Sequence, residues 1–431
     1  MAQGASSRVA AILVVAWGLG AGCASFHPQP LPPGNLRAGA ESVVRDGVTV
    51  RAALLSPKAS KRYFDTALAS HRIQPIWIEI ENRTPDALWF LPVGVDRGYY
   101  PALEAAARSH RRFAPQTNRR IDGFFRAQTL SVMHPAGTTN AGFVFARFTR
   151  GAKAFNVELV APRQLLSFTF AQPVPGFKAD FSRVPFDRLI AADDRRAVDE
   201  PTLRAELAAL PATTTSAGGQ KAGDPLNLVV VGSLETVLKC LVASGWNLTE
   251  PLDPASTWRT MKALVFGGGY ATAPVSHLYA FGRKQDLALQ KPRHALGQRN
   301  HLRLWLTPLE FQGQPVWLGQ ISRDTGIRLT PRSWHLSTHR IAPDVDESRD
   351  YVVADLLLSS ALAKVGWALG VGAASAGAPR RNLGGDPYYT DGLRVVLMLS
   401  AEPVPVAQVE RLRWEQPPRP ELETFLNPDG P

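Results

Sequence analysis

The chain has 431 residues, 45% of them hydrophobic, which is enough for two domains that each bury a core. It contains 2 cysteines, so a fold held together by disulfides is excluded and stability must come from packing. The formal net charge of +11 lies in short basic clusters without interleaved aromatic residues, at 109–113, 118–120 and 379–382. This excludes a nucleic-acid platform and leaves either a solvated surface or attraction to anionic lipid head groups.

The first residues have the pattern of an export signal. Arg8 precedes an uncharged apolar stretch, residues 9–22, which is too short for a comfortable membrane span and ends in small residues before Cys23. A cysteine in that place resembles the lipobox of bacterial lipoproteins, although Gly20 stands where that pattern prefers leucine. We therefore predict that residues 1–23 are a lipoprotein signal peptide and that Cys23 is lipidated, with an ordinary cleaved signal as the alternative.

Lipidation of Cys23 determines the expected location. The resemblance implies that Cys23 carries acyl chains such as palmitate, becomes the mature N-terminus and attaches the protein to the membrane. Ala24 is not the aspartate that retains lipoproteins at the inner membrane, so sorting to the outer membrane, facing the periplasm, is implied. A lipidated Cys23 leaves Cys240 without a disulfide partner. The proline- and glycine-rich residues 24–42 then predict a tether to the first domain.

Residues 43–172 consist of short alternating stretches bounded by turn residues. Ile76, Ile78 and Ile80, for example, fall on one face of a predicted strand. The spacing of these stretches predicts an all-β sandwich, with a helix over 99–113 in one connection. The predicted strands are 47–55, 73–84, 87–93, 129–148, 154–160 and 165–172.

A boundary region, residues 173–223, follows the sandwich. It predicts a linker that contains one helix, over 201–210. The small and polar residues 211–225 are typical of a flexible connection, so we place the domain boundary there.

The second domain is predicted over residues 224–400. It opens with a strand and a helix that is capped by Ser233 and stopped at Gly245, which suits a left-handed C-terminal residue. A later long helix is predicted to reach about Val365. Strands outnumber helices and several are joined by hairpins, so this domain is predicted to be α+β with a mostly antiparallel sheet. Its later strands are predicted at 276–282, 301–311, 315–322 and 393–400, and the proline-rich tail 401–431 is expected to be extended.

Four motifs in the second domain resemble the LssY-like C-terminal domain family, over roughly residues 224–400. They are the segments 274–292, 299–305, 314–327 and 338–357. The family has no established biochemical function, but some relatives carry this domain beside a membrane-embedded lipid phosphatase of the phosphatidic acid phosphatase type, which implies phospholipid or envelope work. The motifs of that phosphatase class, K-x6-R-P, P-S-G-H and S-R-x5-H-x3-D, do not occur in this chain, and neither do G-x-S-x-G, H-E-x-x-H or a P-loop.

Residues 333–351 hold the densest run of side chains that could carry chemistry, including His335 and His339. On a helix, two residues four apart can share a metal ion, whereas on a strand they lie about 13 Å apart. The surrounding residues 331–343 are bounded by proline and are poor helix formers, so a strand is predicted. We therefore predict no metal site from this pair, and no cofactor.

The carboxylates that follow have two interpretations. In the structural one, Asp344 or Asp346 caps the next helix, and Glu347 and Asp350 suit the positive end of its dipole. In the functional one, His339 and the carboxylates meet side chains from elsewhere in the domain and line a polar pocket. The candidate residues for that pocket are Arg283, Asp286, His301, His339, Asp344 and Asp346.

The sequence thus leaves two functions open. The first, which we favour, is a non-enzymatic envelope lipoprotein that binds or scaffolds a lipid, glycan or protein partner. The alternative is a hydrolase acting on a phosphorylated or lipid-like substrate, in which a histidine with carboxylates serves as general acid or base and arginines hold an anionic group. Convergence of the candidates in one concave site would favour the hydrolase, and separation into ion pairs would favour binding.

Overall fold

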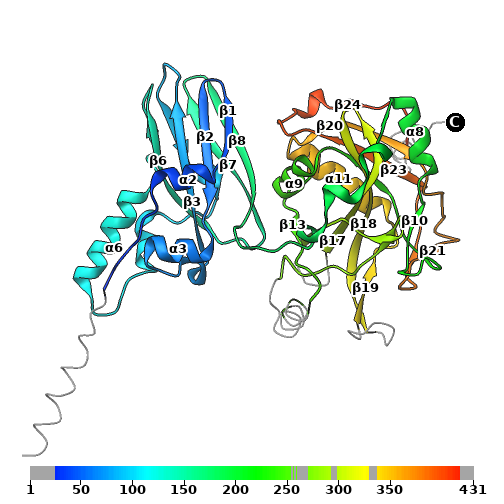
Figure 1. Ribbon diagram of the computed structural model, residues 1–431, viewed down its shortest axis with the longest axis horizontal. Coiled ribbons are helices and arrows are strands. Elements are labelled where there is room, and N and C mark those ends of the chain that lie inside the picture. Colours follow the sequence, from blue (N-terminus) through cyan, green and yellow to red (C-terminus); the bar gives the residue numbers. More distant parts are fainter. Residues whose placement is uncertain are drawn as a thin grey trace, which may run out of the picture. The chain divides into compact units, whose positions relative to one another are not determined.

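The described chain forms two compact units (Figure 1). The computed structural model describes residues 25–253, 256, 259, 270–292, 299–329 and 337–417, with the backbone alone for 327–329 and 337–339. The predicted signal peptide and Cys23 lie outside these residues. The N-terminal unit comprises the described residues up to Thr149 with Phe155–Phe170 and Val174–Gly176, and the C-terminal unit comprises Arg150–Ala154, Ala171–Pro173 and the chain from Phe177 onward.

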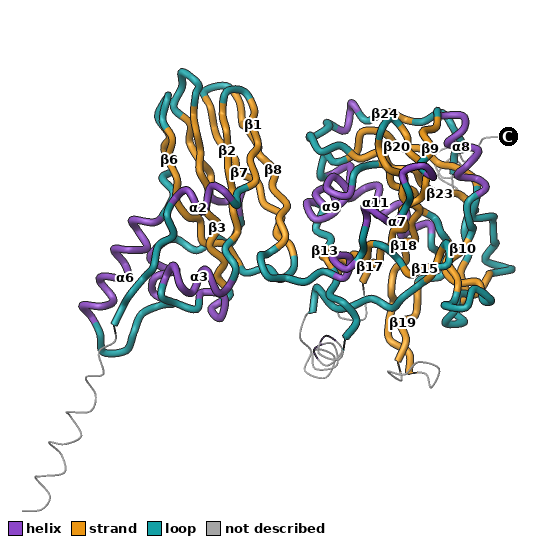
Figure 2. Tube along the Cα trace, in the orientation of Figure 1, coloured by secondary structure: helices purple, strands orange, loops and turns teal. Residues whose placement is uncertain are grey.

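The N-terminal unit is built on two four-stranded sheets, which form the predicted β-sandwich (Figures 1 and 2). Apart from the strand over residues 41–45, which was not predicted, its strands lie within or close to the predicted stretches, because alternating apolar residues must face a core on one side of each sheet. The first sheet has the spatial order β1 (Glu41–Arg45), β2 (Val48–Leu54), β3 (Ile73–Asn82) and β6 (Thr139–Arg147). The second has the order β5 (Met133–His134), β4 (Leu88–Leu91), β7 (Ala152–Ala161) and β8 (Gln164–Pro173).

Strand β3 is buried on both faces. Ile76, Ile78 and Ile80 share one buried face, as predicted, and Trp77 on the other face packs with aromatic residues from two helices. The predicted helix over 99–113 is shorter than expected, and a second helix, α6, was not predicted, although Pro115 begins it and Ile121 and Phe125 give it a buried face. The helices of this unit are α2 (Pro33–Ala38), α3 (Pro57–Phe64), η1 (Leu68–His71), α4 (Pro92–Val95), α5 (Ala102–Ala107) and α6 (Pro115–Gln128).

The proline- and glycine-rich residues predicted to be a tether are folded onto this unit instead. Phe26 and Leu36 are buried in its aromatic core. Arg37 of α2 donates to the buried carboxylate of Glu79 on β3, with an Nη2–Oε2 distance of 2.6 Å, and Arg51 donates to the same carboxylate at 2.9 Å. Composition predicted an extended segment, but two apolar anchors and one ion pair are enough to dock it.

The C-terminal unit contains one large mixed sheet of ten strands, mostly antiparallel as predicted (Figure 2). Parallel pairs join β12 to β23, β20 to β24 and β17 to β9. The main path has the order β13 (Asn247–Leu248), β16 (Leu287–Pro292), β17 (Arg299–Phe311), β18 (Gln314–Leu329), β12 (Leu228–Val231), β23 (Leu393–Leu399), β20 (Leu362–Leu369) and β24 (Glu410–Arg411), with β19 (Ser337–Ile341) beside β18 and β9 (Arg196–Val198) beside β17.

Both faces of this sheet are covered. Helices α9 (Leu234–Ala243) and α11 (Asp346–Leu358) contribute Leu241 and Leu356 to the core on one face, and α8 (Glu200–Ala209) contributes Leu203 to the core on the other. Ser233 caps α9 as predicted, because its hydroxyl accepts from the Thr236 amide at 3.1 Å. The other short elements are η2 (Asp180–Arg183), α7 (Phe186–Leu189), η3 (Ala192–Asp194), β21 (Arg380–Arg381), β22 (Pro387–Tyr388) and η4 (Val406–Gln408).

The predicted linker, residues 173–223, also differs from the expectation. From Phe177 it is part of the C-terminal unit, and it supplies both α8 and β9 to that unit. The stretch 211–225, predicted as flexible, contains β10 (Thr213–Thr215) and β11 (Ala222–Pro225), which join β14 (Tyr279–Ala280) and β15 (Arg283–Lys284) in a four-stranded sheet. Threonine is a good strand former, and Thr214 is fully buried, so β propensity outweighed the small polar composition.

The long helix predicted to reach Val365 ends earlier. Helix α11 stops at Leu358, Ser360 adopts a left-handed conformation with φ +55°, and Val365 lies in β20 opposite Leu397. The alternating residues after Ser360 pair with the central strand β23, and this pairing overrides the helical spacing of the sequence. Among the helices described, none is long and apolar enough to cross a membrane.

Candidate functional site

Two of the predicted site residues, Arg283 and Asp286, pair with each other. The guanidinium of Arg283 makes two hydrogen bonds of 3.0 Å to the buried carboxylate of Asp286, and it also donates to the Leu306 carbonyl at 2.6 Å. Asp286 in turn accepts from the Leu306 amide at 2.7 Å. This arrangement fastens β15 to β17 and leaves both side chains engaged within the fold.

Asp344 and Asp346 hold the start of helix α11, in keeping with the structural interpretation. One oxygen of Asp344 accepts from the amides of Asp346 and Glu347, at 3.0 and 3.3 Å. The carboxylate of Asp346 accepts from the Thr390 hydroxyl at 2.8 Å and the Asp391 amide at 2.6 Å. Burial raises the pKa of Asp346, and the neighbouring positive charge of Arg349 opposes that rise.

The described contacts do not include any between the predicted histidines, His335 and His339, and the carboxylates of Asp344 and Asp346. His335 lies outside the described residues. His339 lies in β19, a strand as predicted, where its backbone pairs with Ile327 of β18, and its side chain lies outside the description. Within the described ranges, no group of three or more histidine, cysteine, aspartate and glutamate residues is arranged to hold a metal ion.

His301 belongs to a buried charged cluster on one face of the large sheet. It alternates along β17 with Leu302 and Leu304, which face the α9 and α11 core, so His301 points to the opposite face. Its Nε2 lies 3.4 Å from Oδ2 of Asp324 on β18, and the two residues are 6% and 3% exposed. Because both faces of the sheet are covered, the face that carries His301 and Asp324 is buried although it is polar.

Two arginines on the same strand face complete this cluster. Arg299 donates to Gln290 at 2.7 Å, and Arg303 donates to Gln320 at 2.7 Å. Burial lowers the pKa of each guanidinium. Burial also raises the pKa of Asp324 to about 7, although both arginines oppose that rise.

Two further carboxylates come from distant parts of the chain. Asp224 of β11 accepts from Asn382 at 2.9 Å, and burial raises its pKa. Asp386, next to β22, acts on Asp324 as a like charge and adds to the rise of its pKa. Perturbed carboxylates gathered with arginines are a feature of functional sites, but structural ion networks show it too. Asp324, Asp224 and Asp386 were missed from sequence because only the topology brings them together; the alternation of Arg299, His301 and Arg303 was the available signal.

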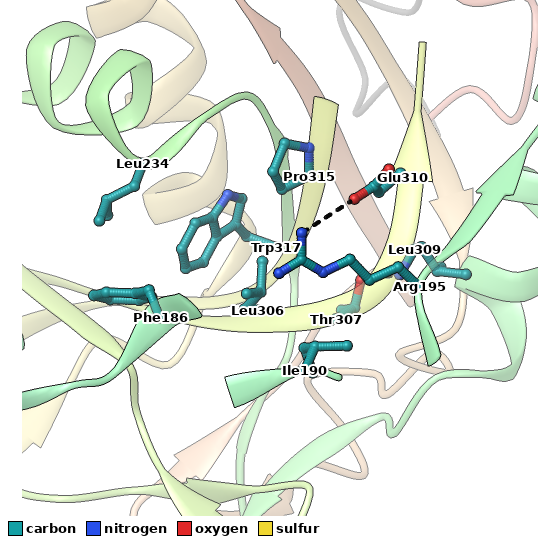
Figure 3. A pocket seen from close by; sticks show the side chains of 10 residues that line it. All are labelled: Phe186, Ile190, Arg195, Leu234, Leu306, Thr307, Leu309, Glu310, Pro315 and Trp317. Atoms are coloured by element: carbon teal, nitrogen blue, oxygen red, sulfur yellow. Dashed lines mark hydrogen bonds and ion pairs between the residues drawn. The ribbon is translucent and has the colours of Figure 1, made fainter. Parts of the chain in front are cut away.

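A separate apolar pocket of about 140 Å³ is lined by residues of the β17–β18 hairpin and of the segment before α8 (Figure 3). The rings of Phe186 and Trp317 pack edge to face, with their centres 5.8 Å apart. At the edge of the pocket, Nη1 of Arg195 lies 3.9 Å from Oε1 of Glu310. Three of its residues belong to the segment predicted as a linker, so sequence reasoning missed it. The lining residues are Phe186, Ile190, Arg195, Leu234, Leu306, Thr307, Leu309, Glu310, Pro315 and Trp317.

Comparison with known proteins gives one finding. Residues 207–393 match the family described as LssY C-terminus. The predicted resemblance is therefore confirmed, and the match begins inside α8, so it includes the β10–β11 hairpin that the sequence suggested was a linker. The buried charged cluster lies wholly within the matched residues, whereas the pocket extends beyond them. No curated protein matches the chain.

Proposed function

We propose that this chain, whose C-terminal unit carries an LssY C-terminus domain, is a lipid-anchored envelope protein that binds a partner without catalysing a reaction on it. The observation that carries the proposal is the engagement of the predicted catalytic residues within the fold. Arg283 pairs with Asp286, and Asp344 and Asp346 hold a helix start. Candidate residues that pair in different places, instead of meeting in one concave site, favour the binding interpretation over the hydrolase.

The apolar pocket is the binding site that this proposal assigns. Seven of its ten lining residues are apolar, and Arg195 at its edge is 42% exposed in its side chain, so it can receive an anionic group. The volume of about 140 Å³ is below the range of roughly 300 to 1,000 Å³ typical of sites for whole small molecules. A single apolar side chain of a partner, or the end of an acyl chain, with a neighbouring carboxylate or phosphate, fits these features.

Filling the pocket is expected to weaken binding. Decanoate, which has an apolar chain and a carboxylate, serves as the probe in titration calorimetry with the full chain. Ile190 is half-buried in the pocket wall, so Ile190→Trp should weaken decanoate binding at least tenfold without unfolding the protein. Leu189→Trp, one residue earlier and outside the pocket lining, is the matched control and should bind as the unmodified protein does. Equal binding by both variants would remove the pocket from the proposal.

Lipid anchoring is tested separately. Replacing Cys23 with serine removes the acceptor of the acyl chains, so the protein is expected to move from the membrane fraction to the soluble fraction of the cell. Metabolic labelling with radioactive palmitate provides the second measurement, and the label should be lost in the variant. Full membrane association of Cys23→Ser with no palmitate incorporated into the unmodified chain would refute lipidation.

The hydrolase remains the second candidate because of the buried charged cluster. His301 and Asp324 lie close together beside Arg299 and Arg303, a set that could move a proton and hold an anionic group. The purified full chain should be assayed for phosphate release from phosphatidic acid. Activity that disappears in His301→Gln, while the melting temperature stays unchanged, would replace the binding proposal with this one.

A further inference from the structure

An aromatic side chain stands out from the surface of the N-terminal unit among arginines. Phe113, in the loop between α5 and α6, is 96% exposed and has φ +57°, a backbone conformation that bulky residues seldom adopt. The guanidinium of Arg112 lies 6.0 Å from its ring centre. A single exposed apolar residue is ordinary on protein surfaces, so the meaning of Phe113 depends on its surroundings.

Those surroundings are strongly basic. Residues 108–126 contain six arginines and one acidic residue, Asp122. Asp122 is engaged by His110 at 2.8 Å. Arg112, Arg119 and Arg120 are exposed. We call the exposed side chains of Arg108, Arg112, Phe113, Arg119 and Arg120 the arginine–phenylalanine surface.

The first described residues are fixed to this same part of the unit. Arg111 donates to the Ser25 carbonyl, and Arg120 donates to the Phe26 carbonyl at 3.4 Å. The Phe26 ring packs against Phe124 of α6, with ring centres 5.7 Å apart. Figure 1 shows the start of the coloured chain beside α6, whereas the β1–β2 turn lies at the other end of the unit. Ser25 is two residues after Cys23, so an acyl chain on Cys23 would be attached close to the arginine–phenylalanine surface.

We propose that the arginine–phenylalanine surface binds the surface of a bilayer that contains anionic lipid. The arginines would contact lipid phosphates, and Phe113 would enter the boundary between head groups and acyl chains. The proposal that this surface faces the membrane rests on the proposed lipidation of Cys23. The lipid anchor would hold the arginine–phenylalanine surface close to the membrane, at high local concentration. A basic surface adds electrostatic attraction to anionic lipid beyond what the acyl chains on Cys23 supply.

The test uses the full chain with Cys23→Ser, so that no acyl chain contributes, and measures sedimentation with vesicles. Binding to vesicles of phosphatidylethanolamine with phosphatidylglycerol should exceed binding to phosphatidylcholine vesicles and should fall with salt. Changing Arg112, Arg119 and Arg120 together to glutamine is expected to weaken binding to the anionic vesicles at least tenfold. Phe113→Asn, which tolerates the left-handed backbone, should weaken it severalfold. Arg163→Gln, at the exposed β7–β8 turn, is the control and should change nothing.

A fluorescent label locates the contact independently of overall affinity. In the Cys23→Ser background the remaining Cys240 is buried, and burial raises its pKa to about 12, so it does not compete for a thiol reagent. An environment-sensitive dye on Phe113→Cys should shift its emission to the blue with anionic vesicles. The same dye on Val44→Cys, at a 70% exposed position near the β1–β2 turn, should not. Equal emission shifts at both positions, or vesicle binding that the arginine changes do not affect, would overturn the proposal. If Cys23 proves not to be lipidated in cells, these vesicle results would not change, so the two proposals can fail separately.

Discussion

Replacing Arg349 with alanine is expected to lower the free energy of unfolding by about 3 to 5 kcal/mol, because it leaves partly buried carboxylates without their buried cation. Arg349 is 1% exposed and makes two hydrogen bonds to Asp391, of 2.8 and 2.9 Å. It also donates to the Leu393 carbonyl at 3.1 Å and lies 3.3 Å from Asp346. One side chain therefore joins α11 to the start of β23. Urea unfolding at neutral pH measures the loss.

Asp350→Asn is the control for this prediction. Asp350 contacts the same guanidinium at 3.2 Å, but its side chain is 62% exposed, so solvent screens the interaction. We expect this substitution to change the free energy of unfolding by less than about 0.5 kcal/mol. A similar loss from both variants would mean that the contacts of Arg349 with Asp391 and Asp346 do not account for its contribution to stability.

The fold could be predicted from sequence where local pattern and tertiary burial agree. Ile76, Ile78 and Ile80 alternate, and they share one buried face of β3 as they predict, although the other face of the strand is buried too. Ser233 and Gly245 bracket α9, because capping chemistry is local and does not depend on what the helix packs against.

The failures occur where a distant strand decides the conformation. Val365 continues the helical spacing of α11, but it is hydrogen-bonded into the sheet beside β23, which begins more than twenty residues later. Thr215 looks like a linker residue, but it pairs with Tyr279 of β14, far along the chain, as well as with the neighbouring strand β11. Composition carries no information about such partners.

The candidate site shows the same limit. Arg283 and Asp286 were identified as neighbours in the sequence, and their proximity is what lets them neutralise each other. His301 was also identified, but its partner Asp324 is on the next strand in a register that only the β17–β18 hairpin fixes. The sequence therefore identified polar residues of this domain. It could not show that Arg283 and Asp286 pair with each other, whereas His301 is buried with charged residues from other strands.

The pH dependence of stability should reveal Asp324. Its pKa is raised from 3.8 to about 7 in the folded protein, so the folded state binds a proton more tightly than the unfolded chain. The stability that this proton contributes is fully present below about pH 4 and is lost as the pH rises to about 7. Across that window the loss amounts to roughly 4 kcal/mol, at about 1.4 kcal/mol for each pKa unit. Asparagine cannot ionise, so Asp324→Asn should gain stability relative to the unmodified protein as the pH rises.

Urea unfolding of the two proteins at pH 5, 6, 7 and 8 measures that difference, with an expected slope approaching 1.4 kcal/mol per pH unit between pH 5 and 7 and a plateau above. Asp224 is present in both proteins, but its charge acts on Asp324, so the difference reports the titration of Asp324 together with its coupling to Asp224. Asp187→Asn, whose side chain is 76% exposed, is the matched control and should give a difference that does not vary with pH. A flat difference for Asp324→Asn as well would mean that His301 and Arg299 keep the Asp324 carboxylate ionised despite its burial, and the cluster would then be a fully compensated ion network rather than one that stores a proton.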